Sequence, residues 1–159
     1  MRFDADYKML IDGKLVDADE AMDVINPATG KPFASCPRAS KADLDTSVEA
    51  AQRAFKTWKK TSVDERRALL RQAAGLIAEN ADALASLFTK EQGRPTDLAK
   101  QEILGASYWL SSTADLDLPV DVTEDTDARR IEVHHVPLGV VCGIVPWNFP
   151  VLLASWKIA

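Results

Sequence analysis

The most informative part of this sequence is VVCGIVPWNFP, residues 140–150. Residues 140–145 are mostly apolar and rich in valine and isoleucine, which predicts a parallel strand buried on both faces. The Pro-Trp-Asn-Phe-Pro block that follows predicts a rigid turn, because each proline fixes its own φ angle. Open α/β sheets hold ligands at the carboxyl ends of their strands. The segment therefore predicts an α/β fold with a site around Asn148, a neutral amide on that turn.

The composition is typical of one globular domain, with 159 residues, 47% hydrophobic residues and a net charge of −5. The sequence has no block of basic residues, so nucleic acid is not an expected partner. No apolar stretch approaches the ~20 residues that span a bilayer, and the acidic start lacks a signal-peptide core. Cys36 and Cys142 have no CxxC spacing, which predicts a reducing compartment without disulfide or metal site. We therefore expect a cytoplasmic protein that does not enter membranes.

Turn signals divide the first forty residues into short strands. Residues 8–16 carry Asp-Gly between two apolar runs, which predicts a hairpin with a type I′ turn. A second strand at 23–25 runs into the turn sequence NPATG, residues 26–30, and a short strand over 32–36 is expected to follow. The fold is thus expected to begin with small strands.

Helical spacing of apolar residues dominates the middle of the chain. A stripe over residues 44–58 predicts a first helix with a buried side, and a capping box at 62–65 begins the second helix. Asn80 is expected to cap the third helix, which should end at Gly93, since glycine readily adopts the left-handed conformation there. A fourth helix is expected to begin near Thr96.

Residues 130–136 alternate in polarity, which predicts a half-exposed strand able to pair at an edge or with a partner subunit. His134 and His135 would point to opposite faces of such a strand, so they are not expected to share a metal ion. Residues 151–159 form a further expected helix without a stop signal. A buried parallel strand also needs neighbouring strands, so we expect the front portion of a larger protein.

These segments together resemble the amino-terminal portion of the aldehyde dehydrogenase superfamily. The order and spacing of the matching motifs follow that family along the whole chain, which would cover about the opening third of a typical member. The Pro-Trp-Asn-Phe-Pro block is the most specific of them. The matching stretches are INPATG at 25–30, EQGRP at 91–95, PLGVV at 137–141 and IVPWNFP at 144–150.

The resemblance implies the front part of a Rossmann-like fold, with amino-terminal strands, a helix cluster and the first buried strand of the cofactor sheet. Residues 1–118 would be the amino-terminal part of the cofactor-binding domain. Residues 119–138 would form an arm for homo-oligomerisation. Residues 139–159 would supply the first strand and the start of the next helix.

The resemblance also implies a reaction. In that family a cysteine thiolate attacks an aldehyde, hydride passes to NAD+ or NADP+, and water hydrolyses the thioester with help from a glutamate. The asparagine that matches Asn148 donates its side-chain N–H to the oxyanion. A neutral amide suits this task because it stabilises negative charge without titrating. The alternative is a turn residue whose side chain bonds its own backbone.

Two groups of binding residues follow from the same resemblance. The stretch that matches the nicotinamide–ribose end of the cofactor cleft comprises Ile144, Val145, Pro146 and Trp147. Positions that match the tunnel for the aldehyde are Phe149, Leu153 and Trp156. Ordinary core packing is the alternative for the apolar members of both groups.

Several family residues have no counterpart in the sequence. The nucleophilic cysteine, the base glutamate and the lysine that holds the cofactor ribose are not matched, and Cys36 and Cys142 are expected to be inert, with Cys142 buried. The chain alone is therefore expected to be inactive as an aldehyde oxidoreductase. Two alternatives remain open: a non-catalytic assembly or binding module, and a superfamily relative that makes an acyl-CoA or reduces an acyl phosphate. The sequence distinguishes neither the aldehyde nor NAD from NADP.

Overall fold

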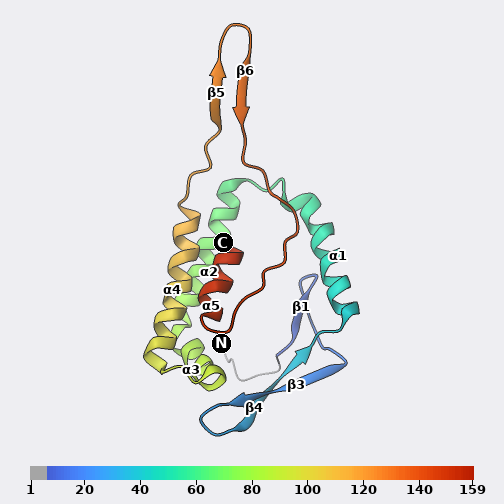
Figure 1. Cartoon of the computed structure of the whole chain (residues 1–159), viewed down its shortest axis with the longest axis vertical. Coiled ribbons are helices and arrows are strands. Elements are labelled where there is room, and N and C mark those ends of the chain that lie inside the picture. The colour runs from blue at the N-terminus through green and yellow to red at the C-terminus, as the bar shows by residue number, and fades with distance from the viewer. Residues whose placement is uncertain (1–6) are drawn as a thin grey trace.

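The computed structural model describes residues 7–159 as a mixed α/β molecule. Most of the helices gather on one side, a small antiparallel strand pair lies at the base, and a long hairpin projects from the opposite end (Figure 1). This arrangement agrees with the expected α/β class. No helix within the described range is long and apolar enough to cross a bilayer.

The first strands form the predicted hairpin. Strand β1, Met9–Ile11, pairs antiparallel with β2, Lys14–Val16. Asp12 and Gly13 have φ angles of 53° and 73°. Both are positive, as a type I′ turn requires, so this prediction is confirmed.

The second strand pair is longer than predicted. Strand β3, Glu20–Asn26, pairs antiparallel with β4, Lys31–Arg38. The turn between them depends on Asn26, whose side-chain oxygen accepts from the Ala28 N–H at 2.9 Å and whose carbonyl accepts from the Gly30 N–H at 2.8 Å. Asparagine favours such turns because its side chain can bond the backbone two residues on.

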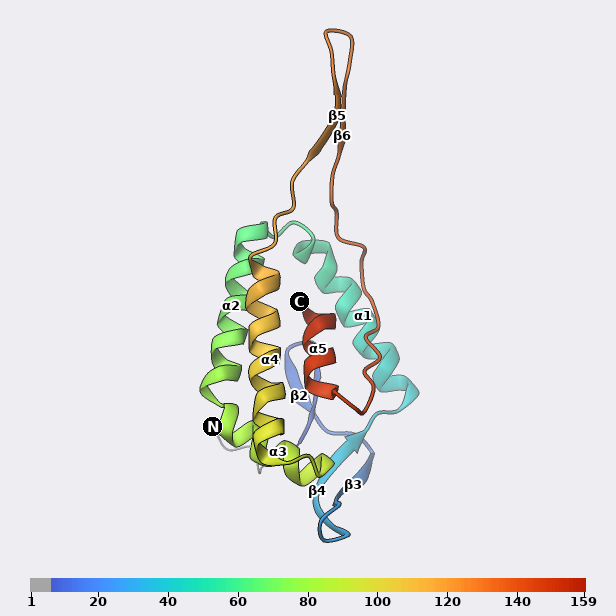
Figure 2. The same ribbon diagram turned by 60° about the vertical axis from the view of Figure 1, so that its left-hand side comes forward.

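Helix α1, Lys41–Trp58, lies apart from the other helices (Figures 1 and 2). It begins with a capping box in which Ser40 and Asp43 bond each other's backbone N–H groups. The expectation of a buried apolar stripe is wrong here, since Leu44 is 57% exposed and Val48 is also exposed. The physical reason is that the main contacts of α1 are with the short strand β1, so much of its apolar side remains uncovered.

Helices α2, α3 and α4 form the packed centre; their bounds are Val63–Glu79, Ala81–Gln92 and Thr96–Ala114. The capping box at the start of α2 is confirmed, and Gly93 ends α3 with a φ of 80°. Asn80 occupies the residue before α3, but its side chain donates to the Leu76 carbonyl instead of capping α3. Buried side chains in the centre are Ala81, Ala85, Phe88, Ala99, Ile103, Ala106 and Leu110.

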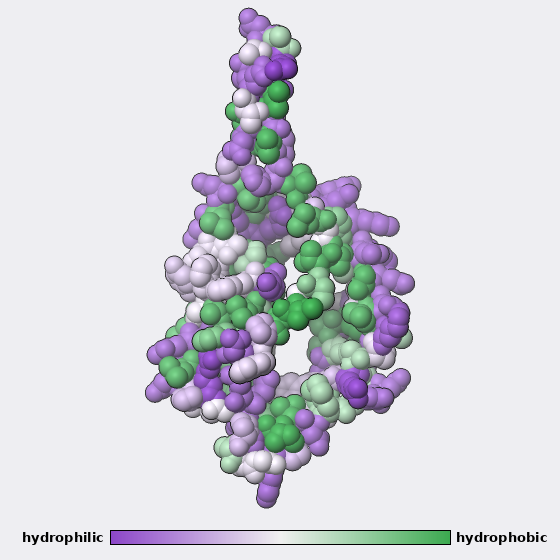
Figure 3. All heavy atoms as spheres, viewed as in Figure 1, coloured by the Kyte–Doolittle hydropathy of each residue, from purple (hydrophilic) through white to green (hydrophobic). Residues whose placement is uncertain are grey.

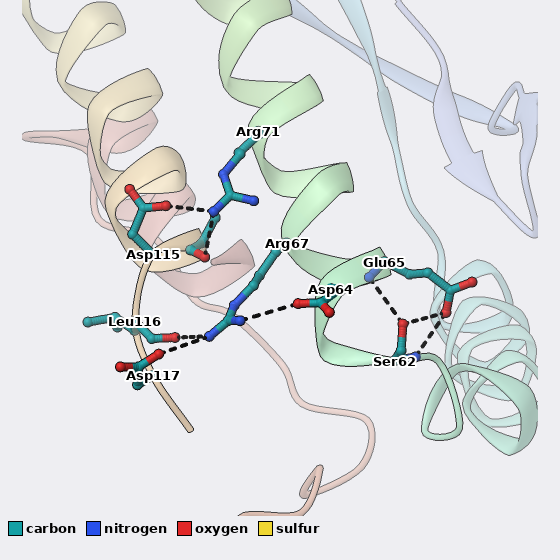
Figure 4. A network of polar contacts seen from close by, with 9 residues as sticks. Ser62, Asp64, Glu65, Arg67, Arg71, Asp115, Leu116 and Asp117 are labelled. Atoms are coloured by element: carbon teal, nitrogen blue, oxygen red, sulfur yellow. Dashed lines mark hydrogen bonds and ion pairs between the residues drawn. The ribbon is translucent and has the colours of Figure 1, made fainter. Parts of the chain in front are cut away.

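Polar contacts join the start of α2 to the end of α4 (Figure 4). Arg67 donates to the Leu116 carbonyl at 2.6 Å and pairs with Asp64 at 3.3 Å. Arg71 donates to Asp115 at 2.7 Å and to the Ala114 carbonyl at 3.3 Å. Arg71 thus binds the last carbonyl of α4, which otherwise lacks a helical partner, and Arg67 binds a carbonyl two residues beyond the helix.

The projecting hairpin consists of β5, Asp121–Asp125, and β6, Arg130–Val133. Arg129 makes two hydrogen bonds to Glu124, at 2.7 and 2.6 Å, close to the hairpin turn. The strand predicted over 130–136 is therefore confirmed up to Val133 and wrong beyond it. The whole of β6 is exposed, so the hairpin extends into solvent.

Residues 134–149 then return between α1 and the helix cluster to α5, Pro150–Ile158 (Figure 1). The expectation of a buried strand at 140–145 is wrong, because this stretch forms no strand and Ile144 is 83% exposed. A parallel strand needs neighbours for its backbone groups, and no described strand lies beside it. The expected burial of Cys142 fails for the same reason. Openings flank this segment in the space-filling view (Figure 3).

Candidate functional site

The turn at residues 146–149 lies against the junction between α3 and α4. Gln92, the last residue of α3, donates its side-chain N–H to the Trp147 carbonyl. Arg94 donates through Nη2 to the Asn148 carbonyl at 2.6 Å. Gly93 lies between the two donors and ends the helix in the left-handed conformation, which turns the chain there. Two consecutive carbonyls of the turn are thus held by one short segment.

Glu102 holds the start of α5 from the neighbouring helix α4. Its Oε1 atom accepts from the N–H groups of Val151 and Leu152 at 3.0 and 3.2 Å. The residue before α5 offers no capping side chain, and Pro150 has no N–H. Glu102 therefore satisfies free donors in the first turn of α5, and its negative charge also suits the amino end of a helix.

Arg94 and Glu102 form a buried ion pair between these two contacts. Arg94 donates through Nη1 to Glu102 Oε2, and the side chains are 17% and 1% exposed, respectively. The guanidinium also lies over the ring of Phe149 at 4.4 Å and that of Phe88 at 5.5 Å, distances typical of cation–π contacts. The pair therefore joins the α3–α4 junction to the turn and to α5.

A cavity of about 590 Å³ opens beside this arrangement. Its walls come from the α3–α4 junction, the turn and the start of α5, and they include Asn148, Phe149 and Leu152. Such a volume lies within the range of small-molecule sites, roughly 300–1,000 Å³. An apolar wall beside a neutral N–H donor could accommodate an aldehyde group and stabilise negative charge on its oxygen.

Asn148 is exposed at this cavity. Its carbonyl accepts from Arg94, while its carboxamide makes no hydrogen bond within residues 7–159. The alternative in which the side chain bonds its own backbone is therefore not what the structure shows. The amide remains available to a ligand, and its catalytic role stays a prediction.

The structure brings together only some of the predicted site residues. Trp147 and Phe149 line the cavity with Asn148, whereas Ile144, Val145 and Pro146 precede it along the extended segment. On α5 the cavity is lined by Leu152, and the predicted Leu153 is half-buried elsewhere. Trp156 packs edge-on against Trp109, with ring centroids 5.3 Å apart, and lies outside the cavity wall.

Sequence reasoning assigned no role to Arg94 or Glu102. Arg94 belongs to the EQGRP motif, but nothing in the motif indicates which distant carbonyl it binds. Glu102 carries a clearer signal, because it is an acid on the buried side of α4, next to Ile103 and one turn from Ala99 and Ala106. An acid in that position needs buried partners. Across the described residues, no group of three or more His, Cys, Asp or Glu side chains could hold a metal ion.

The fold and this site agree with one enzyme class. The family model described as "Aldehyde dehydrogenase family" matches residues 15–159. The chain belongs to the aldehyde dehydrogenase family.

Curated relatives match nearly the whole chain. A 3-sulfolactaldehyde dehydrogenase of Pseudomonas putida is 38% identical over 154 residues, which cover 94% of this chain and 32% of that protein. A succinate semialdehyde dehydrogenase of Acinetobacter baylyi is 36% identical over 157 residues, covering 96% and 32%. The chain thus spans about a third of the length of the curated relatives it matches.

Solved structures show the same fold. An indole-3-acetaldehyde dehydrogenase in its apo form superposes with a TM-score of 0.91 at 32% identity, over 96% of this chain and 37% of that one. A betaine aldehyde dehydrogenase variant from Staphylococcus aureus, in complex with NAD+, gives a TM-score of 0.87 at 27% identity, over 95% and 32%. These matches confirm the predicted front part of a Rossmann-like aldehyde dehydrogenase fold.

Proposed function

We propose that this chain supplies the oxyanion donor and one side of the substrate cavity in an aldehyde dehydrogenase that uses NAD+ or NADP+ to form a carboxylic acid. The supporting observation is the position of Asn148, whose carboxamide has no hydrogen-bond partner among residues 7–159 and lies on a cavity beside apolar walls. Its backbone is held by Arg94 at 2.6 Å, which favours a fixed direction for the side chain.

The chemical argument concerns charge. When a nucleophile adds to an aldehyde carbonyl, negative charge develops on oxygen, and an oriented N–H stabilises that charge without losing a proton. Neither Cys36 nor Cys142 lines the cavity, so we assign neither of them as the nucleophile. Phe149 and Leu152 are proposed to exclude water and to contact the apolar part of the aldehyde. Leu153 and Trp156 are proposed to extend the tunnel along α5.

A nicotinamide cofactor, when bound, supplies the hydride acceptor. The residues present fit one end of such a cofactor: Trp147 offers an exposed ring, and the neighbouring stretch 144–146 forms no strand, leaving backbone groups for ribose or carboxamide contacts. Trp147 is 83% exposed at the cavity, so its ring is accessible to a ligand. We propose that residues 144–147 contact the nicotinamide–ribose end.

Three further expectations belong to this proposal. Residues 119–138, which include the projecting hairpin, act as an oligomerisation arm. Residues 1–118 and 139–159 belong to the cofactor-binding domain. The enzyme works in the cytoplasm on a small aldehyde.

A chimera tests the proposed function. Residues 1–159 would replace the corresponding segment of the Pseudomonas putida 3-sulfolactaldehyde dehydrogenase, and the chimera would be assayed for reduced nicotinamide with its aldehyde. Turnover above that of the same enzyme lacking the segment is expected. A chimera that folds, as shown by circular dichroism and a single oligomer peak, but has no turnover would contradict the proposal.

A further inference from the structure

We infer that Arg94 and Glu102 are positioning residues: together they fix the turn that carries Asn148, and Glu102 acts as the amino-terminal cap of α5 from α4. The catalytic meaning of this inference rests on the proposed function, whereas the positioning itself does not. The observation that supports the inference is that the two side chains form one connected set of contacts. Arg94 bonds the turn, Glu102 bonds the helix that follows it, and the two bond each other.

The burial of Glu102 argues for positioning over simple stabilisation. A buried carboxylate loses its hydration, and a buried ion pair is often no more stabilising than well-packed apolar residues of similar size. Glu102 nevertheless lies on the buried side of α4, beside Ile103. All its described donors converge on it from Arg94, Val151 and Leu152. What these contacts provide is a defined place and direction for the start of α5.

The shape of the Arg94 side chain is equally informative. A guanidinium is a flat fork, so Nη1 can bond Glu102 while Nη2 bonds the Asn148 carbonyl. The rings of Phe88 and Phe149 lie against it and restrict its rotation. A lysine has a single nitrogen on a flexible stem and cannot reproduce both directions with the same rigidity.

The combined effect is to hold Asn148 on both sides. Its carbonyl is bound by Arg94, the carbonyl before it is bound by Gln92, and the helix that follows is bound by Glu102. A donor whose backbone is fixed need not reorganise as charge develops on a ligand, which is the condition for effective oxyanion stabilisation. Neither Arg94 nor Glu102 contacts a reacting atom in the proposed reaction.

Amide hydrogen exchange on the 159-residue chain tests the Glu102 contact directly, because it needs no activity. In Glu102→Ala, the Val151 and Leu152 amides should exchange about tenfold faster or more, since each loses its acceptor. Glu102→Gln keeps an oxygen at Oε1 and should show a smaller increase. The Ile103 and Phe88 amides lie in the helix core and report global unfolding, so their exchange should increase less than that of Val151 and Leu152 in either variant.

The outcomes separate clearly. Protection at Val151 and Leu152 within about twofold of the parent in Glu102→Ala would overturn the inference, as would an equal increase at Ile103. If Glu102→Ala fails to fold, Glu102→Gln decides: an increase over the parent that is larger at Val151 and Leu152 than at Ile103 supports the inference, and an equal or absent increase overturns it. Failure of aldehyde oxidation in the chimera would leave this measurement intact, so the two proposals fail separately.

Arg94→Lys tests the other contact, with Arg71→Lys as its matched control. Arg71 also bridges a carbonyl and an acid, Ala114 and Asp115, but at the far end of α4. The nuclear magnetic resonance signal of the Phe149 backbone amide, which shares a peptide group with the Asn148 carbonyl, should shift in Arg94→Lys and stay unchanged in Arg71→Lys. Unchanged signals in both variants, or equal changes in both, would contradict the positioning role.

Discussion

The hydrogen bonds between Ser62 and Glu65 show how two residues make one contribution to stability depend on pH. Ser62 donates its hydroxyl and its backbone N–H to Glu65, at 2.8 and 3.0 Å. Both bonds lower the pKa of Glu65 below its ordinary value of 4.5, and the bond from the Ser62 hydroxyl has the larger effect. A carboxyl group whose pKa is lowered by folding stabilises the folded state above its unfolded pKa. That contribution is lost as the pH falls through the folded pKa.

Replacing Glu65 by glutamine should therefore weaken the acid sensitivity of folding. At neutral pH the Glu65→Gln variant should melt at a lower temperature than the parent, because its bonds to Ser62 are no longer charge-assisted. As the pH falls from the ordinary glutamate value of 4.5 through the lower pKa of the folded state, the two melting temperatures should converge, because the folded parent then protonates as well. Thermal unfolding followed by circular dichroism across the acid range measures this. A difference in melting temperature that grows as the pH falls would contradict the lowering of the Glu65 pKa by folding.

At the scale of the element, glycine positions decide where helices end. Gly93 has a φ of 80°, and a Cβ atom added there would lie 2.9 Å from Cγ of Pro27. Gly75 lies inside α2 and has open space around its missing side chain. The same substitution should therefore act oppositely at the two positions.

Gly93→Ala should destabilise the fold by about 1–2 kcal/mol, from the positive φ and the contact with Pro27. Gly75→Ala should stabilise α2 by up to about 1 kcal/mol, because alanine is the better helix former. Urea unfolding of the two variants beside the parent gives both free energies. Equal effects of the same sign at both positions would contradict the conformational argument.

Elements whose signals are local could be predicted from the sequence. The turn at Asp12 and Gly13, the capping box at 62–65 and the stop at Gly93 each depend on residues within one turn of chain. The buried strand at 140–145 could not be judged this way, because its burial depends on neighbouring strands that the described residues do not provide.

The site follows the same division. The bend that carries Asn148 was predictable because two prolines surround it, whereas the catalytic role of Asn148 stays a prediction. Arg94 and Glu102 were not, since their partners lie about fifty residues away and no pattern specifies which carbonyl or amide they meet. An acid on the buried side of α4 was the one available signal for Glu102.

At the scale of the whole molecule, much apolar surface remains uncovered. The side of α1 around Leu44 and Val48 is exposed, and the hairpin exposes Ile131 and Val133. The hairpin also has free strand edges, which are templates for pairing with another strand. Its position away from the helix cluster leaves those edges accessible (Figure 1). These features support the proposed oligomerisation arm.

Removing the hairpin should abolish self-association. A variant in which residues 121–133 are replaced by a short Gly-Ser linker should run as a monomer in size-exclusion chromatography with light scattering, while the parent runs as a dimer or larger. Helix content by circular dichroism should be unchanged, because no helix is altered. A parent that is monomeric across the concentration range would contradict the proposed role of residues 119–138 in oligomerisation. A variant that associates as strongly as the parent would contradict it too.

The central claim is that Asn148 donates its side-chain N–H to the oxygen of an aldehyde. The most direct test is kcat of the chimera with Asn148→Ala, with Gln72→Ala, an exposed amide on α2 outside the cavity, as the control. Removing one oxyanion donor should lower kcat by about 10²–10³ with little change in KM, and the control should stay within a few-fold of the parent. A kcat for Asn148→Ala close to that of the unsubstituted chimera would contradict the claim.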